Sequence, residues 1–286
     1  MTRTRATGIG FIAVLLWALL AVFTAASAPV PAFLLNALTF AIGGAVGSVA
    51  VTLRGRWAVL GQVSWKVYLF GTAGLFGYHA LYFSALRLAP PAEAGLIAYL
   101  WPLLIVVFSG LLPNERLRRG HVLGALVSFG GAALIVLRNG ADFDPMATPG
   151  LILAALCAVT WSTYSVVSRR LGAVPTDAVA LFCVFTALLS VPAHLIFETT
   201  LWPETRLAWV SVLALGLGPV GVAFYVWDIG VKHGDIQVLG VASYAAPLLS
   251  TLVLIAAGYA QASWQLLLAA GLITLGAAMA AMASRG

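Results

Sequence analysis

Three polar-tipped rings stand close together in an apolar stretch of the chain. Tyr78, His79 and Tyr82 fall within about 100° of arc on a helix of 3.6 residues per turn, so they can share one wall. Exposing such groups to lipid is costly, which favours a cavity. There the imidazole could donate to a carboxylate or titrate near neutrality. The alternative is a packed helix seam in which His79 bonds to a backbone carbonyl.

A second group of rings comes directly before a proline. Tyr99 and Trp101 precede Pro102, and Tyr244 and Pro247 repeat this pattern later in the chain. Proline removes an intrahelical hydrogen bond and disfavours helical geometry in the residue before it, so we expect two kinked helices. Bent helices commonly flank transporter sites, which predicts a gating role. Membrane helices also tolerate proline without any function.

Two tryptophans lie deep inside apolar stretches rather than at their ends. Interfaces are the usual place for tryptophan in membrane proteins, yet Trp17 and Trp161 do not fit that position. Trp161 shares a helix face with Tyr164. We expect all three rings to line a cavity for a flat, apolar substrate with polar ends, held by stacking and by cation–π contact with an ammonium group.

Asp228 is the most isolated acidic residue in the apolar part of the chain. It could bind a substrate ammonium or carry a proton, or it could pair with Lys232 one helical turn later, and the sequence does not decide between these. Glu93 stands in a predicted first helical turn, where a carboxylate favours the helix dipole. Asn36 is polar but too isolated to interpret.

Membrane-spanning helices must position these side chains. The chain has 286 residues, of which 62% are hydrophobic and 8% charged, and its mean hydropathy is +1.03. A soluble domain carries about 25% charged residues. This composition excludes a soluble globule, and the basic residues fall in loops rather than in a nucleic-acid-binding patch. The sequence therefore predicts an all-α polytopic membrane protein.

Hydropathy and helix breakers divide the chain into ten expected spans. They cover residues 8–26, 32–53, 66–88, 91–111, 120–138, 149–170, 176–197, 207–230, 236–258 and 264–283. Twelve of the fifteen Lys and Arg residues fall on one side, and Arg87, Arg138 and Arg206 on the other. By the positive-inside rule, both termini are expected in the cytoplasm, which agrees with an even number of spans.

The second half of the chain repeats landmarks of the first at nearly one offset. The pairs are Trp17 with Trp161 and Pro31 with Pro175 at 144 residues, and Gly95 with Gly240, Tyr99 with Tyr244 and Pro102 with Pro247 at 145. We expect two repeats, residues 1–140 and 141–286. Five spans in each make the second inverted relative to the first, and inverted repeats place a substrate site near the bilayer midplane.

Two five-helix repeats, each with a proline in its fourth helix, resemble the EamA-type drug/metabolite transporter superfamily over essentially the whole chain. The runs Tyr78-His79-Ala80-Leu81-Tyr82 and Tyr99-Leu100-Trp101-Pro102 are similar to those of YddG-type bacterial aromatic amino acid exporters. Small multidrug pumps of this superfamily use a carboxylate in their first helix. The first expected helix has none here, so their proton exchange cannot be carried over and coupling stays open.

These observations predict an inner-membrane exporter of aromatic or bulky apolar amino acids. Its central pore would work by alternating access or gated facilitated diffusion. The expected substrate-binding residues are Tyr78, His79, Tyr82, Tyr99, Trp101, Trp161, Tyr164, Trp17, Tyr244 and Asp228, with Pro102 and Pro247 at the kinks. A drug or other metabolite exporter of the same fold is the alternative. A membrane enzyme or a structural subunit is a more distant one.

The sequence contains no Gly-x-Ser-Gly nucleophile pattern, no His-Glu-x-x-His helix and no Walker loop. We therefore expect no enzymatic activity, no cofactor and no metal. The expected partners are a small-molecule amino acid or metabolite and the lipid bilayer, with no nucleic acid and a monomeric chain.

Overall fold

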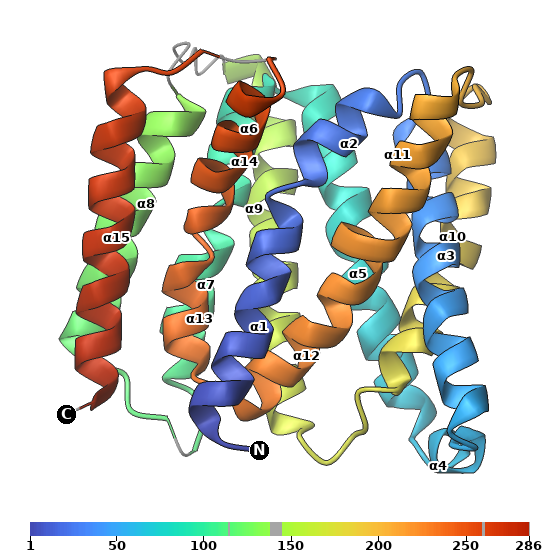
Figure 1. Ribbon diagram of the computed structural model, residues 1–286, viewed down its shortest axis with the longest axis horizontal. Helices are drawn as coiled ribbons and strands as arrows, with labels where there is room; N and C mark the ends of the chain where they lie inside the picture. The colour runs from blue at the N-terminus through green and yellow to red at the C-terminus, as the bar shows by residue number, and fades with distance from the viewer. Residues whose placement is uncertain (114, 138–144, 259–260, 286) are drawn as a thin grey trace.

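The computed structural model describes residues 1–113, 115–137, 145–258 and 261–285, and every regular element in these ranges is helical. Most helices stand side by side along one direction, and the two termini lie at the same end of the bundle (Figure 1). We call this the terminal end and the other the distal end. Arg138 and the expected repeat boundary after residue 140 lie outside the described residues.

Eight helical stretches in the described ranges are long and apolar enough to cross a membrane. Five of them are single helices: α3 (Ala32–Leu53), α8 (Arg119–Val136), α9 (Thr148–Arg170), α10 (Ala178–Phe197) and α15 (Trp264–Arg285). Two are pairs of shorter helices: Arg3–Ala26 contains α1 (Arg3–Trp17) and α2 (Leu20–Ala26), and Ile236–Ala256 contains α13 (Ile236–Ala242) and α14 (Ala245–Ala256). The last, Arg206–His233, contains α11 (Arg206–Leu217), the π-helical η2 (Gly218–Val222) and α12 (Ala223–His233). The chain is a multi-pass, all-helical membrane protein.

The remaining helices are α4 (Trp57–Gly61), α5 (Trp65–Leu88), α6 (Pro91–Ala98), α7 (Trp101–Ser109) and the 3-10 turn η1 (Pro145–Ala147). Neither α5 nor the α6–α7 pair is among the eight stretches, so the expected ten crossings stay a prediction.

Three of the eight stretches are interrupted along their length, and so is the α6–α7 pair. The break between α6 and α7 falls at Tyr99 and Leu100, and that between α13 and α14 falls at Ser243 and Tyr244. Each stands shortly before a proline that cannot donate a backbone hydrogen bond, as the sequence led us to expect. The break after Trp17 and the π turn η2 were not expected.

Glycine lets several helix pairs approach closely. The pairs include α1 with α12, α3 with α10, and α8 with α15, and Figure 1 shows α1 beside α12 and α8 beside α15. A Cβ on Gly10 would lie 2.8 Å from the Cα of Gly230, and one on Gly43 would lie 2.9 Å from the Cα of Gly221. Small residues commonly bring membrane helices into backbone contact in this way.

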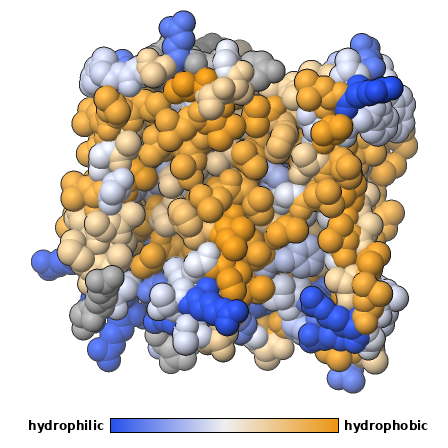
Figure 2. All heavy atoms as spheres, viewed as in Figure 1, coloured by the Kyte–Doolittle hydropathy of each residue, from blue (hydrophilic) through white to orange (hydrophobic). Residues whose placement is uncertain are grey.

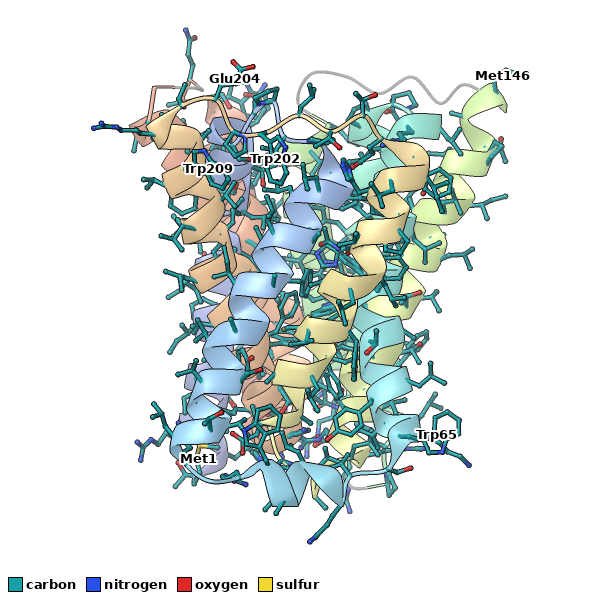
Figure 3. All side chains as sticks on the ribbon, turned by 90° about the vertical axis from the view of Figure 1, so that its right-hand side faces the viewer. Met1, Trp65, Met146, Trp202, Glu204 and Trp209 are labelled. Carbon is teal, nitrogen blue, oxygen red and sulfur yellow. The ribbon has the colours of Figure 1, made fainter. Side chains whose placement is uncertain are left out.

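The visible surface carries a broad apolar belt between two hydrophilic rims (Figure 2). Trp65 lies at one end of the bundle, and Trp202 and Trp209 lie at the other (Figure 3). These three rings are exposed, as are Trp57 and Trp264. Exposed tryptophans at both ends of an apolar belt match the two interfaces of a bilayer.

Candidate functional site

A cavity of about 310 Å³ lies between the interrupted helices and α3, α5 and α9. Seven of the ten expected substrate-binding residues line it, namely Trp17, Tyr78, His79, Tyr82, Tyr99, Trp101 and Trp161. No Asp, Glu, Lys or Arg occurs among its lining residues within the described ranges. The site is therefore aromatic and carries no formal charge apart from what a histidine could acquire.

Four indole rings from four helices pack together, and three of them line one wall of the cavity. We call the four the indole cluster: Trp17, Trp101, Trp161 and Trp227. Trp17 lies at its centre, with ring centroids 6.0 Å from Trp101, 5.8 Å from Trp161 and 5.1 Å from Trp227. The pairs with Trp101 and Trp161 are edge to face, which is one of the preferred geometries of aromatic pairs, and the pair with Trp227 is tilted. Trp227 itself does not line the cavity, and sequence reasoning missed it.

Hydrogen bonds fix two of these indoles. Trp17 Nε1 donates to the carbonyl of Pro219, 3.1 Å away, inside the π turn η2. Trp227 Nε1 donates to Ser165 Oγ on α9 at 3.1 Å. Because a π turn leaves carbonyl groups off the regular helical ladder, the irregular backbone of η2 supplies an acceptor for Trp17. The break after Trp17 and the π turn thus meet at the same wall.

The polar rings of α5 form a second wall. The Tyr78 and Tyr82 rings stack with centroids 6.1 Å apart at 7°, and the Tyr78 ring lies 5.4 Å from that of Trp161. The Nδ1 atom of His79 lies 2.7 Å from the carbonyl oxygen of Leu75. The imidazole therefore bonds to its own helix backbone and also lines the cavity, so the two expectations for it are compatible.

A third wall is polar and comes from α3. Asn36 and Thr39 line the cavity. Asn36 Nδ2 donates to Ser190 Oγ on α10 at 2.7 Å, and Thr39 Oγ1 donates to the carbonyl of Leu35 at 2.8 Å. In the sequence, Asn36 stood out only as one polar residue in an apolar stretch. That signal was too weak to predict a cavity wall.

Three expected site residues lie outside the cavity lining. Tyr164 is buried between Trp161 and Phe70, with ring centroids 5.2 Å and 5.8 Å away. It packs against Gly74, where a Cβ would come within 2.4 Å of its ring. The hydroxyl of Tyr244 accepts a hydrogen bond from the backbone N–H of Leu103 at 3.1 Å. Both tyrosines contact helices rather than open space.

Asp228 is the third, and it forms a buried ion pair. Its Oδ2 atom accepts from Lys232 Nζ at 2.8 Å and from Thr176 Oγ1 at 2.6 Å. Lys232 also donates to the carbonyl of Val174 at 2.9 Å. Of the two interpretations that the sequence left open, the structure contains the bridge one turn apart.

Ion pairs hold helices together at the terminal end. Glu115 accepts from Arg3 at 3.0 Å and also contacts Arg169. Arg3 lies 3.2 Å from Asp235, and Arg169 donates to the backbone carbonyl of Gly234 at 2.8 Å. These contacts join the first helix, the α7–α8 connection, α9 and the α12–α13 connection. We call them the terminal ion network.

The cavity lining extends toward the distal end. It includes Thr24, Val30 and Ala32 from α2, the α2–α3 connection and the start of α3, and these elements meet at the end opposite the termini (Figure 1). Glu198 braces that end, because its carboxylate accepts from the backbone N–H groups of Phe33 and Leu34 at 2.9–3.2 Å.

The same Glu198 carboxylate binds two further groups. It lies 3.0 Å from an Arg87 guanidinium nitrogen and 3.0 Å from His194 Nδ1. It therefore caps the first turn of α3 and links that turn to α5 and α10.

The comparisons with known proteins agree with this architecture. The model of the EamA-like transporter family matches residues 5–137 and again residues 148–282. The aromatic amino acid exporter YddG of Ancylobacter novellus is 55% identical, with all of both chains covered. A solved crystal structure superimposes with a TM-score of 0.95 at 54% identity, again over all of both chains.

More distant relatives carry two different names. The aromatic amino acid exporter YddG of Escherichia coli K12 is 25% identical over 93% of this chain and 94% of its own length. The biotin transporter of the same strain is 28% identical over 72% of this chain and 70% of its own.

Proposed function

This chain belongs to the EamA-like transporter family, and we propose that it exports aromatic or other bulky apolar amino acids across a bacterial inner membrane. The observation that carries the proposal is the aromatic cavity of about 310 Å³. Small-molecule sites typically have volumes of roughly 300–1,000 Å³ and are mostly apolar with a few polar groups. The 55% identical relative is named for this substrate class.

Different walls of the cavity bind different parts of the substrate. The ring of an aromatic amino acid stacks against Trp17, Trp101 and Trp161, which offer faces and edges at one wall. The hydroxyls of Tyr78, Tyr82 and Tyr99 can donate to the substrate carboxylate, since a phenol is both donor and acceptor.

Tyr164, Tyr244 and Asp228 act from outside the cavity. Tyr164 backs the Trp161 ring, and Tyr244 braces the backbone just after the α6–α7 break. Asp228 links α12 to the α9–α10 connection, because it accepts a hydrogen bond from Thr176.

We further propose ten crossings in two inverted repeats, residues 1–140 and 141–286, with a monomeric chain and both termini cytoplasmic. Adding α5 and the α6–α7 pair to the eight apolar stretches gives the ten. The two separate family matches support the repeats. The excess of basic residues on one side supports the orientation.

Alternating access would start from a cavity that reaches the distal end. The indole cluster and the terminal ion network close the other end. Pro102 and Pro247 follow helix breaks at equivalent places in the two halves, and such positions can absorb the backbone rotation of a gating step. In the proposed orientation, the cavity faces outward. Gated facilitated diffusion through the same cavity would need smaller motions.

A counterflow assay in proteoliposomes tests the proposal. Vesicles loaded with Phe should accumulate labelled Phe, Tyr and Trp, and W101A should reduce this flux at least tenfold. W264A, at an exposed position, is the matched control and should leave the flux unchanged.

Flux of biotin or of a cationic drug, without any flux of Phe, Tyr or Trp, would refute the substrate class. The biotin transporter relative makes such a metabolite exporter the second candidate. Unchanged flux in W101A would instead favour a structural role.

A further inference from the structure

We propose that Asn36, Thr39 and His79 form the binding site for the α-ammonium group of the substrate. The proposal rests on the proposed function and deepens it, because it says which end of the amino acid each wall recognises. An ammonium group has three N–H donors and no acceptor. The site that binds it must therefore offer acceptors. All three residues line the cavity, and their hydrogen bonds leave each side chain an acceptor that these bonds do not use.

The tautomer of His79 follows from its backbone partner. Nδ1 lies 2.7 Å from the carbonyl oxygen of Leu75, which can only accept, so Nδ1 must carry the proton. In a neutral imidazole, the other nitrogen is then an acceptor. No described Asp or Glu lines the cavity to favour an imidazolium. His79 therefore presents the lone pair of Nε2.

The orientation of the Asn36 amide follows in the same way. Ser190 Oγ donates its one hydrogen to the carbonyl of Thr186 at 2.7 Å, which leaves it with lone pairs alone. Its contact of 2.7 Å with Asn36 must therefore come from the amide nitrogen Nδ2. The carbonyl Oδ1 of Asn36 points away from Ser190 and is the second acceptor of the lining.

Thr39 supplies the third acceptor. Its hydroxyl hydrogen goes to the carbonyl of Leu35 at 2.8 Å, so lone pairs of Oγ1 remain. Asn36 and Thr39 are three residues apart on α3 and share a face. Phe40, the next residue of α3, packs edge to face on the His79 ring at 5.1 Å. The three acceptors therefore stand where α3 and α5 meet.

Aromatic rings surround this polar corner. Tyr78 and Phe224 lie 5.2 Å and 6.3 Å from the imidazole, measured between ring centroids. Ring faces attract a cation, and they do so without a fixed counter-charge. Recognition by neutral acceptors and rings suits a net-neutral zwitterion, which must leave again on the far side of the membrane. It also assigns the carboxylate to the tyrosine hydroxyls rather than to His79.

Substrate analogues that lack one charged group test the assignment. We would measure inhibition of labelled Phe counterflow by Phe, by phenethylamine, which lacks the carboxylate, and by 3-phenylpropionate, which lacks the amine. In N36L and H79F, the half-inhibitory concentrations of Phe and phenethylamine should rise about tenfold, which corresponds to one charge-assisted hydrogen bond. That of 3-phenylpropionate should change less than twofold.

Two further variants keep the test falsifiable. H79Q retains an acceptor and should recover most of the affinity for phenethylamine, which distinguishes lost hydrogen bonding from misfolding. H233F makes the same change at an exposed position outside the cavity and should alter nothing.

Weaker binding of 3-phenylpropionate alone in H79F would mean that His79 holds the carboxylate, and it would overturn the proposal. Unchanged selectivity between phenethylamine and 3-phenylpropionate in both N36L and H79F would also overturn it. A wild-type protein that moves no aromatic amino acid would refute the proposed function instead.

Discussion

The indole rings of Trp17 and Trp161 meet edge to face with centroids 5.8 Å apart, although 144 residues separate them in the chain. They are the tryptophans that recur at equivalent places in the two halves. Trp17 ends α1 at a helix break, whereas Trp161 lies within the continuous helix α9. Residues that the sequence repeat pairs with each other thus contact each other at one wall of the cavity.

Trp17→Ala should lower the free energy of unfolding by about 2–3 kcal/mol, below the usual cost of truncating a fully buried large ring, because Trp17 is partly buried. The variant loses contacts with three indoles and the hydrogen bond to Pro219. Thermal unfolding in detergent micelles measures the effect. Trp264→Ala is the control, because that ring is 67% exposed and its loss should cost less than about 0.5 kcal/mol. Equal losses in the two variants would contradict the central position of Trp17.

Breaking the buried pair of Asp228 and Lys232 should destabilise the protein more than removing both charges. D228N or K232M leaves one buried charge without its partner, which costs about 3–5 kcal/mol. The double variant D228L/K232M should regain most of that stability. R54A removes an exposed partner of Asp177, and it should cost no more than about 1 kcal/mol.

Transport by this double variant separates structure from function for the same pair. If Asp228 acts through the fold alone, a folded D228L/K232M protein should transport Phe at a rate within twofold of wild type. A folded but inactive double variant would show that Asp228 carries a proton or contacts the substrate.

Glu198→Ala should destabilise the start of α3. The carboxylate accepts from two backbone N–H groups of the first turn and binds Arg87 and His194. Loss of a helix cap alone costs about 0.5–2 kcal/mol, and the lost contacts with Arg87 and His194 add to it. Hydrogen exchange at Phe33 and Leu34 should accelerate. The exposed Glu204, labelled in Figure 3, offers the matched control E204A, which should leave that exchange unchanged.

The helix breaks differ in how far the sequence predicts them. Pro102 and Pro247 mark two of them, because proline acts locally and its effect is visible in the chain itself. The break after Trp17 contains neither proline nor glycine, only Ala18 and Leu19 between helices. The contact between the Trp17 indole and η2 fixes this region, and such a tertiary contact leaves no local signal.

The cavity lining shows the same limit. The rings of α5 were predictable, since helical periodicity brings Tyr78, His79 and Tyr82 to one side. The roles of Asn36 and Glu198 depend on partners 154 and 165 residues away. For Asp228, the sequence offered both Lys232 and a substrate as partners. It gave no reason to prefer Lys232, because the choice depends on which groups are buried beside the carboxylate in the folded chain.

Labelling with a membrane-impermeant maleimide should define the orientation. A cysteine in E204C, at the distal end, should react on intact cells, and one in R56C should react only after permeabilisation. The native Cys157 and Cys183 are buried, so the wild-type protein serves as a low background. The reverse pattern would place the termini outside.

Glu115→Gln should weaken the terminal ion network and, in the proposed mechanism, the closure of the terminal end. The Glu115 carboxylate is almost fully buried between Arg3 and Arg169, and each hydrogen bond to a charged group contributes about 1.5–3 kcal/mol. Losing that charge leaves the two guanidinium groups facing a neutral amide. The equilibrium should then shift toward a state that opens between α1, α9 and α12.

The reactivity of the cavity-lining A246C from the terminal side measures this shift. It should rise about tenfold in E115Q for each 1.4 kcal/mol lost from the closed state. D177N also removes a carboxylate that pairs with arginines at the terminal end, but its partners Arg54 and Arg56 are exposed. That variant should leave the reactivity unchanged. Equal labelling in E115Q and D177N would mean that the indole cluster, rather than the terminal ion network, holds this end closed.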